Sequence, residues 1–447
     1  MKLDILGRLV ELSTEKTYSL PDDIVPKHVD GFLLLVSPSN GNWIVVDNQL
    51  QADIVKAFIS GQSIEKVIRN FNLDEVNSDL QYILRQIEGK RFTETILPDE
   101  ESFVLRLYVT NKCDLRCKHC FMYAGEQAGN ELSLQEIQDI IRTSKNGGCS
   151  KVILSGGEVS TRTDLAEIIK YAKGQGLYVQ LMTNGYGWKK ETINEIAPYI
   201  DEVQISVDGY NEEINSLIRG KGVFERALQS LDWFYEHTNV FTNIVITPLY
   251  GFLDKYVQEY IDFGKHLIDK YDPNRFLLII NSELIDGRTV KADKAKNIIM
   301  QQAADRIYEE IYPNSKLTTF VANHFKNRIY RNCGYGSLTV AANGDYYFCG
   351  RIFDVKCYGN VRNEDFQSVL KKRKLAREKS YVDHLEPCSR CELKYICGGG
   401  CRVANFPEVV EMDLEQKETA VTRSNVCTEL DKLEIYRNMI NGNDFLY

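Results

Sequence analysis

The segment Cys113-Asp114-Leu115-Arg116-Cys117-Lys118-His119-Cys120 is the most informative stretch of this 447-residue chain. It follows Val104–Val109, an apolar run that is typical of a buried strand. Cysteines with this spacing on one loop can hold three corners of a cubane iron–sulfur cluster, which leaves the fourth iron without a protein thiolate. The pattern also fits a zinc site that lacks one ligand, or a set of buried structural cysteines.

Strand and helix patterns alternate from about residue 102 to residue 285. One helical pattern begins with a capping box formed by Ser133 and Glu136. Six strand–helix units predict an α/β fold with a parallel sheet, which is either open and doubly wound or a partial barrel. The predicted strands are Val104–Val109, Lys151–Leu154, Tyr178–Met182, Glu202–Val207, Phe241–Thr247 and Phe276–Ile280.

Residues 1–95 have the pattern of a separate module. Phe32–Val36 and Trp43–Val46 flank the turn-rich segment Ser37–Gly41 and predict a β-hairpin. Three helical patterns follow, so the sequence predicts a winged-helix-like module. A DNA-binding domain is the alternative, but few basic residues lie on the last of these helices.

Composition excludes several classes of protein. The net charge of −9 argues against a nucleic-acid partner, and no run of eighteen apolar residues provides a membrane span. We expect a cytoplasmic protein without a signal peptide, because charges interrupt the N-terminal residues. Of the twelve cysteines, none precedes Cys113 and eight lie beyond residue 330. In a reducing compartment, clustered thiols of this kind indicate metal or iron–sulfur ligands.

The C-terminal cysteines form a second cluster. Residues 286–330 predict a charged helical connector, and from residue 331 the helix and strand signals weaken, as in a loop-rich region held by metal. A zinc ribbon is the alternative, but seven cysteines suit two cubanes with three and four ligands better than tetrahedral zinc. The seven are Cys333, Cys349, Cys388, Cys391, Cys397, Cys401 and Cys427.

The CxxxCxxC loop resembles the signature of the radical S-adenosylmethionine (SAM) enzymes. Ser155–Glu158, after the second predicted strand, is similar to the GGE motif of that family, and Thr183–Gly185 ends the third strand as in many relatives. The resemblance implies a partial (β/α)6 TIM-like barrel over residues 100–285. It also implies that a [4Fe–4S] cluster is bound by Cys113, Cys117 and Cys120.

The same resemblance implies which residues contact SAM. Gly156 and Gly157 would let the backbone approach the methionine part, and Glu158 would meet the amino group. The remaining implied contacts are Ser206 and Asp208 with the ribose and methionyl groups, Arg219 with the carboxylate, and His119 near the adenine. The residues by themselves also allow His119 to be a solvated loop histidine, and Ser206 and Asp208 to be a strand end with a helix cap.

Cysteine for cysteine, residues 331–447 resemble the SPASM extension of peptide-modifying radical SAM enzymes. The resemblance implies two auxiliary [4Fe–4S] clusters. Cys357 either completes cluster I or is an incidental loop thiol, and we expect Cys149 to be a buried small hydrophobe. The implied ligands are Cys333, Cys349 and Cys401 for cluster I, and Cys388, Cys391, Cys397 and Cys427 for cluster II.

Together, the resemblances imply an enzyme that modifies a ribosomal precursor peptide, similar to the thioether-forming maturases of sactipeptides and ranthipeptides. The implied cofactors are SAM and three [4Fe–4S] clusters, and the implied reaction joins a substrate cysteine to an unactivated carbon through a 5′-deoxyadenosyl radical. The implied partners are a precursor peptide, whose leader sequence binds residues 1–95, and an electron donor such as a flavodoxin or ferredoxin. The sequence identifies no catalytic acid or base.

Three alternatives to this function remain open from the sequence. The same radical chemistry can form carbon–carbon or ether cross-links in a peptide, which a closed cluster I would favour. It can also oxidise a protein side chain. An alternative from a different class is a DNA-binding regulator with metal-sensing cysteines, which the acidic composition disfavours.

Overall fold

The computed structural model describes residues 1–5, 8–93, 102–127, 129–313, 333–414 and 421–443. The chain folds into two compact units. We call them the sheet unit, Glu101–Pro313 with Gly336–Ala376, and the terminal unit, Met1–Glu100 with Asn314–Tyr335 and Arg377–Tyr447. None of the helices in the described ranges is long and apolar enough to cross a bilayer.

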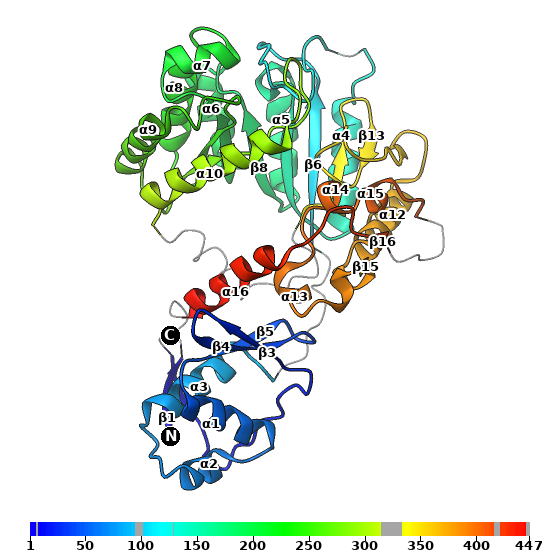
Figure 1. Ribbon diagram of the computed structural model, residues 1–447. Helices are drawn as coiled ribbons and strands as arrows, with labels where there is room; N and C mark the ends of the chain where they lie inside the picture. Colours follow the sequence, from blue (N-terminus) through cyan, green and yellow to red (C-terminus); the bar gives the residue numbers. More distant parts are fainter. Residues whose placement is uncertain (6–7, 94–101, 128, 314–332, 415–420, 444–447) are drawn as a thin grey trace. The chain divides into compact units, whose positions relative to one another are not determined.

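Six parallel strands form the centre of the sheet unit, and each lies next to its neighbour in the sequence (Figure 1). This order confirms the predicted α/β fold with a large parallel sheet, and every predicted strand is present. The strands are β6 (Phe103–Thr110), β7 (Cys149–Gly156), β8 (Tyr178–Thr183), β9 (Glu202–Ser206), β10 (Phe241–Ile246) and β11 (Phe276–Ile280).

Helices connect these strands, and apolar residues at helical spacing explain which face of each helix is buried. In the first helix, Ser133 and Glu136 form the predicted capping box. The helices are α4 (Leu134–Asn146), α5 (Leu165–Gly174), α6 (Lys190–Ile196), α7 (Glu212–Arg219), α8 (Val223–Tyr235), α9 (Val257–Lys270) and α10 (Lys294–Ile311), with short 3-10 turns at Val159–Thr161 and Ala197–Tyr199.

Three short strands extend the sheet beyond β6. The strand β12 (Leu338–Val340) pairs in parallel with β6, and β13 (Asp345–Tyr347) and β14 (Gly359–Asn360) continue the sheet antiparallel. These strands were not predicted, because strands of two or three residues carry no periodic signal in the sequence. The helix α12 (Phe366–Lys379) follows. The region that we expected to be one domain from residue 331 therefore contributes to both units.

The N-terminal part of the terminal unit contains an antiparallel sheet of three strands in the order β3-β4-β5. The predicted hairpin and three helices are present, whereas β3 and the antiparallel pair β1 and β2 were not predicted. The elements are β1 (Lys2–Ile5), β2 (Arg8–Glu11), β3 (Val25–Val29), β4 (Phe32–Ser37), β5 (Asn42–Val46), α1 (Gln49–Ile59), α2 (Ile64–Asn70) and α3 (Ser78–Gly89).

The C-terminal part of the same unit is built from short elements and one longer helix, α16 (Glu429–Asn443). The short elements are 3-10 turns at Val382–His384 and Cys388–Arg390, the strands β15 (Leu385–Glu386) and β16 (Val421–Thr422), and the helices α13 (Lys394–Cys397), α14 (Arg402–Asn405) and α15 (Pro407–Glu411).

Both faces of the three-stranded sheet are buried. Leu35 and Ile44 pack in one core with α1, α2 and α3. The opposite face lies toward α16 (Figure 1). There, Leu34, Trp43 and Val45 form a second core with residues of α13 and α16. Trp43 Nε1 also donates to the Met439 carbonyl at 2.9 Å. Residues 1–95 therefore share a hydrophobic core with the C-terminal cysteine region.

Truncation of Trp43 tests this shared core. We expect Trp43→Ala to lower the free energy of unfolding by about 3–5 kcal/mol, because the side chain is fully buried and its removal leaves a cavity. Hydrogen exchange of α16 should accelerate in this variant. Leu9→Ala, at a side chain that is 71% exposed, is the control and should change stability by less than about 0.5 kcal/mol. Unchanged exchange of α16 in Trp43→Ala would contradict the shared core.

Candidate functional site

The cysteine loop leaves the carboxyl end of β6, the edge of a parallel sheet at which ligands commonly bind. Three other segments hold its backbone. The Cys113 N–H donates to the Gly125 carbonyl at 2.8 Å, and the Lys118 N–H donates to the carbonyl of Ile218 in α7 at 3.1 Å. The Cys120 carbonyl accepts the N–H of Arg288, which follows β11, at 3.1 Å. The loop is therefore held by elements from across the sheet.

The three thiols of this loop are free and lie close together. Cys117 is buried with Leu115 and Val223, and Cys113 and Cys120 pack against this cluster. Burial raises the pKa of Cys113 to about 12 and also raises the pKa of Cys117. Across the described residues, no three donor side chains converge on a single ion. A cubane binds each thiolate at a different iron, so this donor set fits a cluster better than mononuclear zinc.

The two glycines of the predicted GGE motif touch the start of the cysteine loop. Gly156 adopts a φ of +137°, which favours glycine. The Gly157 N–H donates to the Thr110 carbonyl at 2.7 Å, and a Cβ atom on Gly157 would lie 2.2 Å from the Lys112 carbonyl oxygen. A side chain at this position would push the cysteine loop away from β7.

Glu158 is buried and connects β7 to the end of β8. Its carboxylate accepts hydrogen bonds from Thr183 Oγ1 at 2.6 Å and from the Asn184 N–H at 2.7 Å. Burial raises the pKa of Glu158, and these two donors oppose the shift. Asn184 Nδ2 in turn donates to Asp114 Oδ1 at 2.7 Å and lies 3.9 Å from Cys113 Sγ. Asn184, which joins the two motifs, lies in the predicted segment Thr183–Gly185 but was not among the predicted site residues.

Asp208 contacts two other predicted site residues, His119 and Arg219. Its Oδ2 lies 2.7 Å from His119 Nε2 and 2.6 Å from Arg219 Nε, although it is fully buried. Burial by itself would raise the pKa of Asp208. The interactions with Arg219, and to a smaller extent with His119, have the larger effect and lower this pKa to about 2. Arg219 Nη1 also lies 3.9 Å from Cys117 Sγ. Ser206 is half-buried at the end of β9.

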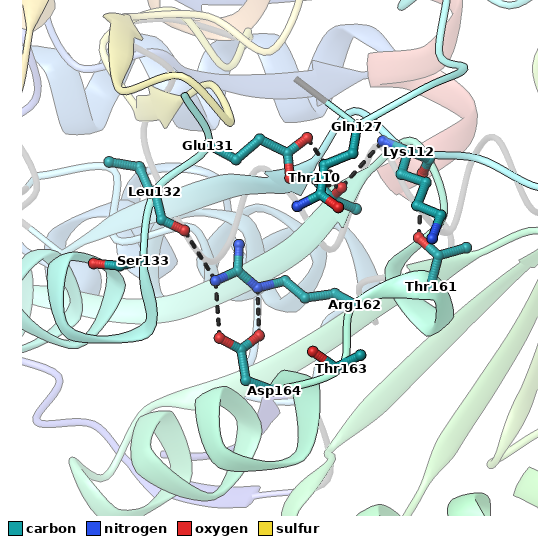
Figure 2. Close-up of a pocket in the computed structure, with 10 residues that line it drawn as sticks. All are labelled: Thr110, Lys112, Gln127, Glu131, Leu132, Ser133, Thr161, Arg162, Thr163 and Asp164. Carbon is teal, nitrogen blue, oxygen red and sulfur yellow. Dashed lines mark hydrogen bonds and ion pairs between the residues drawn. The ribbon is translucent and has the colours of Figure 1, made fainter. Parts of the chain in front are cut away.

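A polar pocket of about 310 Å³ lies beside the cysteine loop (Figure 2). Arg162 pairs with Asp164 and donates to the Leu132 carbonyl, and Glu131 accepts from Thr110 Oγ1. The charged groups therefore largely satisfy one another, and none of the predicted site residues lines this pocket. Its lining residues are Thr110, Lys112, Gln127, Glu131, Leu132, Ser133, Thr161, Arg162, Thr163 and Asp164.

Six of the C-terminal cysteines belong to the terminal unit, and four of them lie near Arg402. This side chain is fully buried and donates to the carbonyls of Ser380 and Gly398. Burial lowers the pKa of Arg402, and four nearby thiols oppose that shift. No carboxylate among the described residues pairs with its guanidinium. The four thiols belong to Cys333, Cys388, Cys397 and Cys401.

The remaining cysteines of the predicted clusters are divided between the terminal unit and the sheet unit. In the terminal unit, Cys427 lies near Cys388, and burial raises its pKa. Cys349 and Cys357 belong to the sheet unit. Cys357 is exposed, and its thiol donates to the Gly359 carbonyl at 3.5 Å. Cys391 is half-buried and packs against the core of α16.

Cys149 lies at the start of β7 and is buried, in agreement with the expectation for a small hydrophobe. Its thiol donates to the Lys151 carbonyl at 3.2 Å. Burial raises its pKa to about 11, as expected for an inert structural thiol.

Comparisons with known proteins agree with these features. Residues 107–264 match the radical SAM superfamily, and residues 332–392 match SPASM, an iron–sulfur cluster-binding domain. Mycofactocin maturase MftC of Mycolicibacterium smegmatis is 28% identical over 312 residues, which cover 67% of this chain and 77% of that protein. The AdoMet-dependent heme synthase of Oleidesulfovibrio alaskensis is 26% identical over 330 residues, which cover 67% and 82%.

The fold is similar to that of Streptococcus suis SuiB. The crystal structure of SuiB bound to S-adenosylmethionine covers 90% of this chain and 100% of that chain, with 20% identity and a TM-score of 0.51. The structure of SuiB bound to its precursor peptide SuiA covers 90% and 99%, with 18% identity and a TM-score of 0.53.

Removal of the Asp208 charge tests the buried network. We expect Asp208→Asn to lower the free energy of unfolding by about 3–5 kcal/mol, because it leaves the buried Arg219 guanidinium without its partner. Urea denaturation of the metal-free protein measures this loss. Asp139→Asn removes one carboxylate from an exposed pair with Arg142 and should cost less than about 1 kcal/mol. Equal losses in both variants would show that the Asp208 pair contributes no more than a surface pair.

Proposed function

Since the chain is a radical SAM enzyme that also carries a SPASM domain, we propose that it modifies a ribosomally made precursor peptide by forming thioether links from cysteine to unactivated carbons. The names of its relatives support a peptide substrate, since one of them is a PqqA peptide cyclase and SuiB binds the precursor peptide SuiA. The observation that carries the proposal is the contact of the cysteine loop with the GGE turn at the carboxyl ends of β6 and β7.

In this proposal Cys113, Cys117 and Cys120 hold the cluster that binds SAM. Three free thiols around a small apolar core, with no fourth ligand in the motif, suit an open iron. When bound, the cluster and SAM would supply a radical that removes a hydrogen atom from an unactivated carbon. As the C–S bond forms, the thiol proton would leave to solvent and the surplus electron would pass to an auxiliary cluster. This chain holds the cofactor through its own groups, which are His119, Gly156, Gly157, Glu158, Ser206, Asp208 and Arg219.

Within this group Asp208 has a positioning role. It fixes Arg219 and His119 through one carboxylate oxygen, while the other accepts the Thr247 N–H at 2.9 Å. A buried, ionised carboxylate with these partners holds the guanidinium in one orientation beside Cys117. Glu158 has a comparable role, because its hydrogen bonds fix the end of β8 against the GGE turn.

The C-terminal cysteines would hold the auxiliary clusters, and the surroundings of Arg402 in the terminal unit support this assignment. A buried cation without a carboxylate partner is costly unless negative charge lies close by. Iron–sulfur clusters with thiolate ligands carry negative charge, and four of the predicted ligands face this guanidinium. The proposed ligands are Cys333, Cys349 and Cys401 for cluster I, with Cys357 as the candidate fourth, and Cys388, Cys391, Cys397 and Cys427 for cluster II.

Residues 1–95 are proposed to bind the leader segment of the precursor. A small sheet can capture an extended peptide by β-strand addition, in which main-chain hydrogen bonds supply the affinity. This module shares a core with α16. Deleting the module would therefore expose apolar side chains of the cysteine region to solvent. Point variants are therefore better tests of leader binding than truncation.

Anaerobic reconstitution with the precursor peptide tests the proposed reaction. Three cubanes predict about twelve irons per chain, and changing Cys113, Cys117 and Cys120 together to Ala should abolish SAM cleavage but leave about eight. Mass spectrometry should show that each link removes a pair of hydrogens and that the linked thiols no longer react with iodoacetamide. A modified product with unchanged free thiols would point to carbon–carbon or ether links. A colourless protein that carries zinc would refute the proposal.

A substitution at Arg402 tests the auxiliary sites. We expect Arg402→Met to retain about four irons per chain, because the cation that faces both proposed cluster sites is lost. Arg402→Lys keeps a cation and should retain more iron than Arg402→Met. Arg390→Met, at a side chain that is 79% exposed, is the matched control and should retain all of the iron. Full iron content in Arg402→Met would contradict this role.

A further inference from the structure

The strand β6 carries an arginine that no carboxylate neutralises. Leu105 and Leu107 of this strand are almost fully buried, and Arg106 and Tyr108 alternate with them on the opposite face of the sheet. Arg106 is half-buried. Among the described residues, no acidic side chain pairs with its guanidinium. A partly buried cation of this kind needs negative charge from another source.

The guanidinium of Arg106 lies against the segment that contains Cys349. A Cβ atom on Gly350 would lie 2.0 Å from Arg106 Nη1, so a side chain at this position would displace the guanidinium. On the same face of β6, Tyr108 Oη donates to the Gly350 carbonyl at 2.7 Å. All four residues belong to the sheet unit. Two neighbouring side chains of β6 therefore contact the residue that follows Cys349.

The charges of Arg106 and Cys349 act on the same hydroxyl group. Burial raises the pKa of Tyr108 to about 12, the positive charge of Arg106 opposes this shift, and the Cys349 thiolate adds to it. Cys349 is a free, half-buried thiol and one of the proposed ligands of cluster I. The contacts at Gly350 thus place the guanidinium beside a proposed iron ligand.

The same face of the sheet carries a predicted SAM contact. In a parallel sheet, paired residues of neighbouring strands lie on one face. The register pairs Arg106 with Ile153, and Ile153 with Gln180. Gln180 in turn pairs with Glu202, and Ser206 lies on the same face farther along that strand. The guanidinium and the segment against it therefore lie on the side of the sheet where SAM is proposed to bind.

We propose that Arg106 raises the reduction potential of the auxiliary cluster that Cys349 is proposed to bind. This inference rests on the proposed function. Thiolate-bound clusters are anionic, and reduction adds a further negative charge, which a nearby cation stabilises. In the proposed reaction the substrate carbon radical and the cysteine thiol form the C–S bond, release the thiol proton to solvent and give up one electron. A cluster with a raised potential accepts that electron more readily.

Redox potentiometry followed by electron paramagnetic resonance measures this effect. It uses the full-length chain whose three loop cysteines are changed to Ala, so that only the auxiliary clusters titrate. In Arg106→Met, we expect the ratio of reduced to oxidised cluster at the original midpoint potential to fall about tenfold, which is a shift of about 59 mV for one electron. The other auxiliary cluster is the internal control and should not shift.

Two further variants separate charge from packing. Arg106→Lys keeps a cation and should stay within about twofold of the original ratio. Arg142→Met removes an exposed arginine of α4 and is the matched control, with no shift expected. Equal shifts in Arg106→Lys and Arg106→Met would assign the effect to packing and overturn the proposal.

Iron analysis establishes that each variant carries both clusters. If Arg106→Met loads less iron, Gly350→Ala decides, because its methyl group displaces the guanidinium without changing the charge of the chain, and the same ratio should fall. Unchanged potentials in the loaded variants would overturn the proposal. Weaker binding of the precursor peptide at unchanged potentials would assign Arg106 to a carboxylate of the peptide and would also overturn it. A native chain without iron at its C-terminal cysteines would refute the proposed function itself.

Discussion

The close approach of Gly157 to the strand before the cysteine loop is the contact on which the site depends. With no side chain at this position, the main chain just after β7 bonds to the Thr110 carbonyl and passes against Lys112. This contact fixes where the loop begins, and it places Glu158 at the end of β8, where Thr183 and Asn184 bind its carboxylate. The cysteine motif and the GGE motif thus pack directly against each other.

The two units differ in how a buried arginine is compensated. In the sheet unit, Asp208 and Arg219 neutralise each other within the protein, so the network can be preorganised before any cofactor binds. In the terminal unit, Arg402 has thiols and carbonyls around it and no carboxylate partner among the described residues. A charge of this kind is best compensated by an anionic group that the protein acquires, which is why Arg402 supports the proposed auxiliary clusters.

The small N-terminal sheet is a structural part of the terminal unit as well as a candidate peptide-binding element. One of its faces packs on α1, α2 and α3, and the other packs on α13 and α16, so the two ends of the chain stabilise each other. Gln86 and Lys90 close one edge of the sheet as part of the same packing.

The sequence by itself determined the six parallel strands, the N-terminal hairpin and the cysteine loop, because apolar periodicity and cysteine spacing are local patterns. It missed β3, where Pro26, Lys27 and His28 hide the strand pattern. Only the tertiary structure decided which groups meet. Asp208 binds His119 across 89 residues of chain, and Lys90 binds Asn443 across 353, because folding closes loops whose contacts leave no periodic trace in the sequence.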